Sequence, residues 1–138
     1  MPPLARWFIR LSLIYLALAL LLWTVQALGW VGAVPGWVGA LSPAALHLFF
    51  VGWATQMIMG VAYWMFPRER QRPYGIQALA LATLLLLNGG LALRLVGEPL
   101  HTLYPGTGWG WVLVASGALQ WLAGVAFVAN TWGRIRGR

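Results

Sequence analysis

The sequence contains no cysteine and no lysine, and its acidic residues are only two, Glu69 and Glu98. Without cysteine the chain can form no disulfide, no iron–sulfur cluster and no thiolate metal site. Charged residues make up 8% of the chain, far below the roughly 25% of an ordinary soluble domain. Because 61% of the residues are apolar, the composition excludes a water-soluble globule and a disordered chain alike.

Long hydrophobic runs fill most of the 138 residues, and the mean hydropathy is +0.76. A membrane-spanning helix needs roughly 20 apolar residues, so four spans use about 80 positions and leave short connections. The runs predict spans at about 7–28, 44–66, 76–96 and 109–132. Ser42 and Pro43 fit the start of the second span, as an N-cap followed by proline at the first helical position. We therefore expect an all-α, integral membrane four-helix bundle that forms one transmembrane domain, 1–138.

Eight of the nine arginines fall in the N-terminal segment, the second connection and the C-terminal segment. They are Arg6, Arg10, Arg68, Arg70, Arg72, Arg134, Arg136 and Arg138. Four spans place these three segments on one side of the membrane, and the positive-inside rule makes that side the cytoplasm. A basic nucleic-acid-binding surface would use the same charges, but membrane orientation accounts for them. We expect a multi-pass protein of the cell inner (cytoplasmic) membrane with the lipid bilayer, and no nucleic acid, as partner.

The first connection contains a short repeat, GWVGA, at 29–33 and again at 36–40. It is apolar and uncharged, and each copy carries a tryptophan, Trp30 and Trp37. Tryptophan is enriched at membrane–water interfaces. The repeat therefore predicts an interfacial turn with two anchors, with a cofactor lid and a partner-docking surface as the alternatives.

Ionisable side chains at membrane depth are costly, and they are candidates for functional sites by default. His47 lies close to the start of the second span, and Arg94 lies near the end of the third. Glu98 and His101 follow directly, and we expect His101 in a loop between Pro99 and the fourth span. In this topology all four side chains gather at the outer side of the membrane.

A neutral imidazole is the expected state of His47, because burial and the positive end of a helix dipole both disfavour imidazolium. Neutral imidazole is what a haem iron or a copper ion takes as a ligand. Arg94 would then pair with haem propionates at the outer surface. The alternative is that His47 bonds to a neighbouring helix, while Arg94 reaches the interface and pairs with Glu98.

Signatures of catalysis are missing from the sequence. The predicted spans contain no acidic residue, and the chain has neither an HExxH zinc signature nor a glycine-rich phosphate loop. Polar residues in mid-span, among them Gln56 and Asn88, suit hydrogen bonds between helices better than ligation. We expect the chain not to be an enzyme on its own.

The second span reads HLFFVGWATQMIMGVAYWMFP from His47 to Pro67. Its order of histidine, two spaced glycines, an aromatic residue and a closing proline resembles the haem-ligating helix in subunit I of haem–copper oxidases and nitric oxide reductases. It also resembles helices of the NnrS family, which are haem- and copper-containing membrane proteins linked to nitric oxide. The segment 94–99 and the end of the last span, 127–132, are similar to the tail of such modules.

The resemblance implies that His47 is an axial ligand to a b-type haem on the outer side of the membrane, with copper the less expected metal. His101, or His47 of a second chain in a homodimer, would supply the sixth ligand. Subunit I has many more spans and an adjacent histidine pair for copper, which this chain lacks. We therefore expect a small respiratory-type haem protein for electron transport or for binding a diatomic gas such as nitric oxide. The alternative is a cofactor-free accessory subunit of a larger respiratory oxidase or nitric oxide reductase complex.

Overall fold

The computed structural model describes residues 1–67 and 75–135, and these residues form helices and short turns with no strand among them. Three of the helices are single long elements, α1 (Pro3–Gly29), α4 (Gln77–Leu103) and α5 (Trp109–Ile135). A 27-residue helix is about 40 Å long, which exceeds the ~30 Å hydrocarbon core of a bilayer. Together with the segment Gly36–Met65, four helices are long and apolar enough to cross a membrane. The expected all-α four-helix fold is confirmed.

The second long segment is one continuous helical path built from four pieces. It consists of η1 (Gly36–Leu41), α2 (Ser42–His47), η2 (Leu48–Thr55) and α3 (Gln56–Met65). The helix begins eight residues before the predicted start at residue 44, because a tight 3₁₀ turn opens it, with the Val38 amide donating to the Pro35 carbonyl over 3.1 Å. The second copy of the GWVGA repeat is therefore helical, and only the first copy lies at the turn.

The third long helix extends beyond the predicted end of the third span at residue 96. Helix α4 continues past residue 96, through Pro99, and ends at Leu103. Beyond the proline, the Thr102 hydroxyl donates to the Glu98 carbonyl over 2.9 Å, and the Tyr104 amide donates to the Leu100 carbonyl over 2.9 Å. The placement of His101 in a loop is therefore wrong, since His101 lies in the last turn of α4.

A wide π-helical stretch, η2, directly follows His47. Within it the Thr55 hydroxyl donates to the carbonyl of Phe50, five residues earlier, over 2.9 Å. Helix α1 packs closely here, because a Cβ atom at Gly52 would lie only 2.8 Å from Cγ of Tyr15. π-Helical turns are rare overall, but those that occur are often found at functional sites. This π-helical stretch begins directly after His47, the predicted haem ligand.

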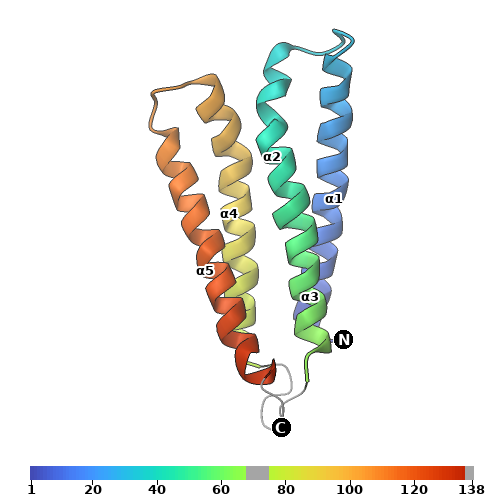
Figure 1. Cartoon of the computed structure of the whole chain (residues 1–138), viewed down its shortest axis with the longest axis vertical. Helices are drawn as coiled ribbons and strands as arrows, with labels where there is room; N and C mark the ends of the chain where they lie inside the picture. The colour runs from blue at the N-terminus through green and yellow to red at the C-terminus, as the bar shows by residue number, and fades with distance from the viewer. Residues whose placement is uncertain (68–74, 136–138) are drawn as a thin grey trace.

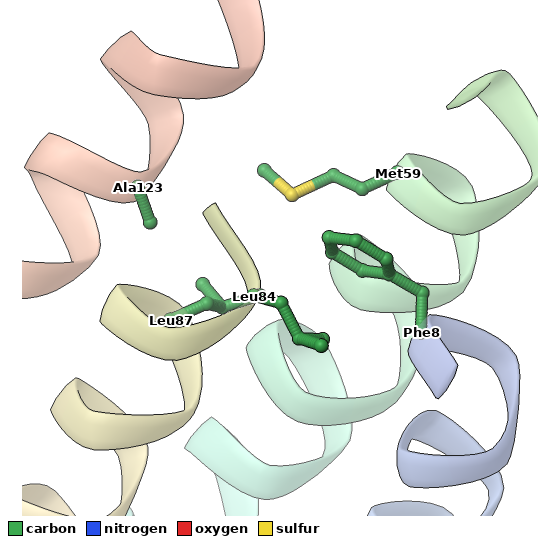
Figure 2. Packing of buried hydrophobic residues seen from close by; sticks show 5 residues of the cluster. All are labelled: Phe8, Met59, Leu84, Leu87 and Ala123. Carbon is green, nitrogen blue, oxygen red and sulfur yellow. The ribbon is translucent and has the colours of Figure 1, made fainter. Parts of the chain in front are cut away.

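The helices pair as two hairpins, with α1 against the η1–α3 segment and α4 against α5 (Figure 1). All four long segments contribute to one buried cluster of Phe8, Met59, Leu84, Leu87 and Ala123 (Figure 2). Helix α1 begins and α5 ends at the same end of the bundle (Figure 1), which we call the terminal end. The opposite end holds the two short turns, 30–35 and 104–108, and we call it the distal end.

Candidate functional site

The distal end contains an ion-paired cluster made of residues from both hairpins. His47 is the last residue of α2, and Glu98 lies in the penultimate turn of α4. Nδ1 of His47 lies 3.1 Å from Oε1 of Glu98. The Glu98 side chain is only 8% exposed, whereas that of His47 is 34% exposed. The structure thus brings together two residues that the sequence separates widely, and it buries the carboxylate between α2 and α4.

The hydrogen bonds of His47 determine which ring nitrogen carries the proton. Nδ1 lies 2.9 Å from the carbonyl oxygen of Pro43 and also close to the Glu98 carboxylate. Both oxygens are acceptors, so Nδ1 must be the donor. Nε2 has no hydrogen-bond partner among the residues that the structure describes. In the neutral ring the lone pair of Nε2 is therefore available to a ligand.

Arg94 lies one helical turn before Glu98, and its Nη1 donates to Oε1 of that residue over 2.9 Å. The ion pair that the sequence offered as the alternative is thus present. The Arg94 side chain is 19% exposed, and its guanidinium lies against α5, because a Cβ atom at Gly117 would lie 3.8 Å from Nη2. One carboxylate oxygen therefore accepts a hydrogen bond from Arg94 of α4 and lies against the His47 ring of α2.

Two polar atoms of this cluster have no partner within the described residues. They are Nε of Arg94 and Oε2 of Glu98, and both are buried. Buried polar groups in folded proteins are usually paired, so an unpaired one calls for an explanation. A buried ionisable cluster with spare hydrogen-bonding capacity, within helices of membrane-spanning length, is a candidate functional site.

His101, the second predicted ligand, lies one turn beyond Glu98 and is exposed. Its ring lies toward α5, since a Cβ atom at Gly110 would be 3.8 Å from its Cε1 atom. Within residues 1–67 and 75–135 no hydrogen bond or ion pair joins it to His47, Arg94 or Glu98. The structure therefore brings together three of the four expected residues and leaves His101 apart.

The donor set favours one kind of metal group over others. Among the described residues no three or more His, Asp or Glu side chains are grouped to hold a metal ion. A copper or zinc ion usually takes three or four protein ligands. A haem brings four nitrogen ligands of its own and needs only one or two from the protein. A single oriented imidazole with a free Nε2 therefore fits haem better than a bare metal ion.

No protein-family model, curated protein or solved structure matches this chain. The functional argument therefore rests on the geometry of the residues themselves. Sequence reasoning identified His47 and Arg94, but it gave Glu98 only a secondary part as a partner of Arg94. The available signal was the spacing of Arg94 and Glu98, four residues apart on a helix, which favours an ion pair.

A second polar cluster lies at the terminal end, and the sequence analysis did not single it out. Arg134 is buried, and its guanidinium donates to the carbonyl oxygens of Tyr63 (3.2 Å), Phe66 (2.8 Å) and Pro67 (3.2 Å). One turn earlier, Oδ1 of Asn130 accepts the amide of Ile76 over 2.7 Å. Helix α5 thereby caps the end of α3 and the start of α4, which is a structural role.

Hydrogen bonds in mid-membrane also link the helices, as the polar residues of the spans predicted. The Tyr15 hydroxyl donates to Oδ1 of Asn88 over 2.7 Å and joins α1 to α4. Nε2 of Gln56 donates to the Phe8 carbonyl over 3.3 Å, and Gly60 leaves room for Cβ of Phe8. These contacts confirm that Gln56 and Asn88 are packing partners between helices.

Proposed function

We propose that this chain is a small membrane haem protein of respiratory type, in which Nε2 of His47 is an axial ligand to a b-type haem. The observation that carries the proposal is the orientation of His47, whose Nδ1 donates to the Pro43 carbonyl and lies 3.1 Å from an oxygen of the Glu98 carboxylate. Histidines that bind metals almost always donate their other ring N–H to such groups. This contact fixes the tautomer and the ring plane, and it raises the basicity of the nitrogen that binds.

The residues around His47 have separate tasks in this proposal. Pro43 and Glu98 hold the ring, and Arg94 balances the charge of Glu98. A bound haem would supply an iron that exchanges one electron or binds a diatomic gas such as nitric oxide. Because His101 lies apart from His47, the second axial position is left to a gas molecule or to His47 of a second copy in a homodimer.

The optical spectrum of the purified protein tests this proposal. We expect a Soret band, with sharp α and β bands after reduction if the iron is six-coordinate. His47→Ala should abolish these bands, because the other histidine, His101, lies apart from the carboxylate that orients the His47 ring. His101→Ala is the matched control and should keep the haem, with at most a change of spin state. Full haem retention in His47→Ala, or loss only in His101→Ala, would contradict the assignment.

A cofactor-free accessory subunit of a larger oxidase or nitric oxide reductase complex is the second candidate. This function is favoured by the ion pair between Arg94 and Glu98. Because Glu98 already balances the charge of Arg94, this arginine does not need a haem propionate as its partner. A colourless protein that copurifies with such a complex would support this function. The same preparation therefore separates the two candidates, because a haem spectrum in the isolated chain is expected only of the first.

For the membrane and its orientation, we propose the cell inner membrane with the terminal end in the cytoplasm. Arg6 and Arg10 are exposed at that end, and the distal turn 30–35 carries no charge. Positively charged short segments stay in the cytoplasm. A reporter fused after Arg138 should be active only in the cytoplasm, and activity only outside would reverse the orientation.

A further inference from the structure

One oxygen atom, Oε1 of Glu98, connects the two positively polarised groups of the distal cluster. His47 Nδ1 lies 3.1 Å from it and Arg94 Nη1 lies 2.9 Å from it. The other carboxylate oxygen, Oε2, is buried and has no partner among the described residues. Arg94 and His47 therefore both lie against one oxygen of the carboxylate, although its second oxygen is left over.

A shared carboxylate couples the two groups electrostatically. In a low-dielectric interior the field of the Glu98 carboxylate at the imidazole depends on whether the arginine beside it balances its charge. While Arg94 is present, the carboxylate polarises the Nδ1–H of His47 less. When the Arg94 charge is removed, the carboxylate polarises this N–H more, and the imidazole gains basicity at Nε2.

No hydrogen bond or ion pair joins Arg94 to His47 directly within the described ranges. Nη2 of Arg94 faces α5, where a Cβ atom at Gly117 would lie 3.8 Å from it. Arg94 and Glu98 are also held in a fixed relation, since they lie one turn apart on the same rigid helix. The contact route from Arg94 to His47 therefore runs through the carboxylate.

We infer that Arg94 and Glu98 act as a linked pair of positioning residues, in which Arg94 sets the electronic character of His47 through Glu98 and not through haem propionates. The inference rests on the proposed function for its effect on a haem, but the coupling itself is a property of the protein without cofactor. Three consequences follow for the reduction potential. Glu98→Gln raises it, because a less basic ligand favours reduced iron. Arg94→Gln lowers it, because the Glu98 charge is no longer balanced. In a Glu98→Gln background, Arg94→Gln loses most of its effect.

The test is a double-mutant cycle on the haem-loaded protein, measured by redox titration. The four proteins are the parent, Glu98→Gln, Arg94→Gln and the double variant, with Arg94→Lys as the conservative control that should stay close to the parent. We expect single shifts of opposite sign, and an Arg94→Gln shift in the Glu98→Gln background that is less than half of the shift in the parent. An equal shift in both backgrounds would mean that Arg94 acts on the cofactor directly, and it would overturn the inference.

A second readout works even when no haem is bound, which separates this inference from the proposed function. In a His101→Ala background, His47 is the sole histidine, so the NMR shift of its Nδ1–H proton, which donates to the Pro43 carbonyl, reports how strongly the nearby Glu98 carboxylate polarises that N–H. Glu98→Gln should move this signal upfield, and Arg94→Gln should move it downfield only while Glu98 is present. A colourless parent that shows this pattern would refute haem binding but keep the coupling. An Nδ1–H shift unaffected by Glu98→Gln would refute the coupling in a parent that binds haem or in one that does not.

Discussion

At the distal end Arg94 meets a carboxylate on its own helix, whereas at the terminal end Arg134 meets main-chain carbonyls at the end of α3. Both are arginines within apolar helices, yet their partners differ in kind. A carboxylate can be removed by mutation together with its arginine, but backbone carbonyls cannot. We therefore expect the fold to depend on the terminal cluster and to tolerate replacement of the distal pair by apolar residues.

The two clusters also differ in what their polar atoms pair with. Arg134 donates to the carbonyls of Tyr63, in the last turn of α3, and of Phe66 and Pro67, which directly follow α3. In the distal cluster Oε2 of Glu98 and Nε of Arg94 are buried without a partner in the described part of the chain. Ionisable groups in membrane-spanning helices are candidates for function by default. We therefore take the distal cluster, and not the terminal cluster, as the candidate functional site.

Among the substitutions that test this comparison, Arg134→Leu is expected to lower the free energy of unfolding most. The substitution leaves several carbonyls of the 63–67 segment without their donor, and we expect a loss of about 3–5 kcal/mol of unfolding free energy. Unfolding in mixed detergent micelles, followed by circular dichroism, measures it. Arg6→Leu is the control, because Arg6 is exposed at the same end and should change stability by less than about 0.5 kcal/mol. If Arg134→Leu and Arg6→Leu had equal free energies of unfolding, the proposed structural role of Arg134 would be wrong.

A smaller effect, and a sharper contrast, is expected at the distal end. Arg94→Leu leaves the buried Glu98 carboxylate with only His47 as partner, and we expect a loss of about 2–3 kcal/mol. The double variant Arg94→Leu/Glu98→Leu replaces the pair by apolar groups and should return to within about 1 kcal/mol of the parent. The same unfolding assay measures the free energies of unfolding of the parent, the single variant and the double variant. A double variant that is less stable than Arg94→Leu would show that the distal pair is structural after all.

The smallest effect concerns the bond that joins the hairpins between the two ends. Tyr15→Phe removes the hydrogen bond to Asn88, and intramembrane hydrogen bonds contribute on average about 0.6 kcal/mol. We expect a loss of that order in the unfolding assay. Tyr104→Phe is the matched control, since Tyr104 is exposed beyond the end of α4 and should give no measurable change. A loss above about 2 kcal/mol would make Tyr15 part of a third structural cluster.

Four spans, and the separation of charged from apolar segments, could be predicted because hydrophobicity is a local property of each segment. The helix ends were less predictable. The sequence placed the start of the second helix near Ser42, although a 3₁₀ turn from Gly36 continues into it. It also stopped the third helix before Pro99, although α4 runs to Leu103 and includes His101. Proline and glycine weaken a helix locally, but neighbouring turns can maintain it.

The candidate site was partly predictable for a similar reason. His47 and Arg94 stand out because charged or ionisable residues are scarce in apolar runs. The role of Glu98 depends on its distance to His47, which lies on another hairpin. Arg134 looked like any other arginine of a basic C-terminal segment, yet it is buried against carbonyls up to 71 residues away in the sequence. Pairings of that range leave no local pattern to read.

The sequence by itself determined that this chain forms four membrane-length helices, because in a bilayer each helix must satisfy its own backbone hydrogen bonds and each apolar run does so independently. It also determined which side chains are costly at membrane depth. Only the tertiary structure decided which of them meet: His47 and Arg94 on one oxygen of Glu98, and Arg134 on the carbonyls of the 63–67 segment. The physical reason is that the contacts between helices depend on packing across the whole bundle, where the spacing along the chain gives no measure of distance.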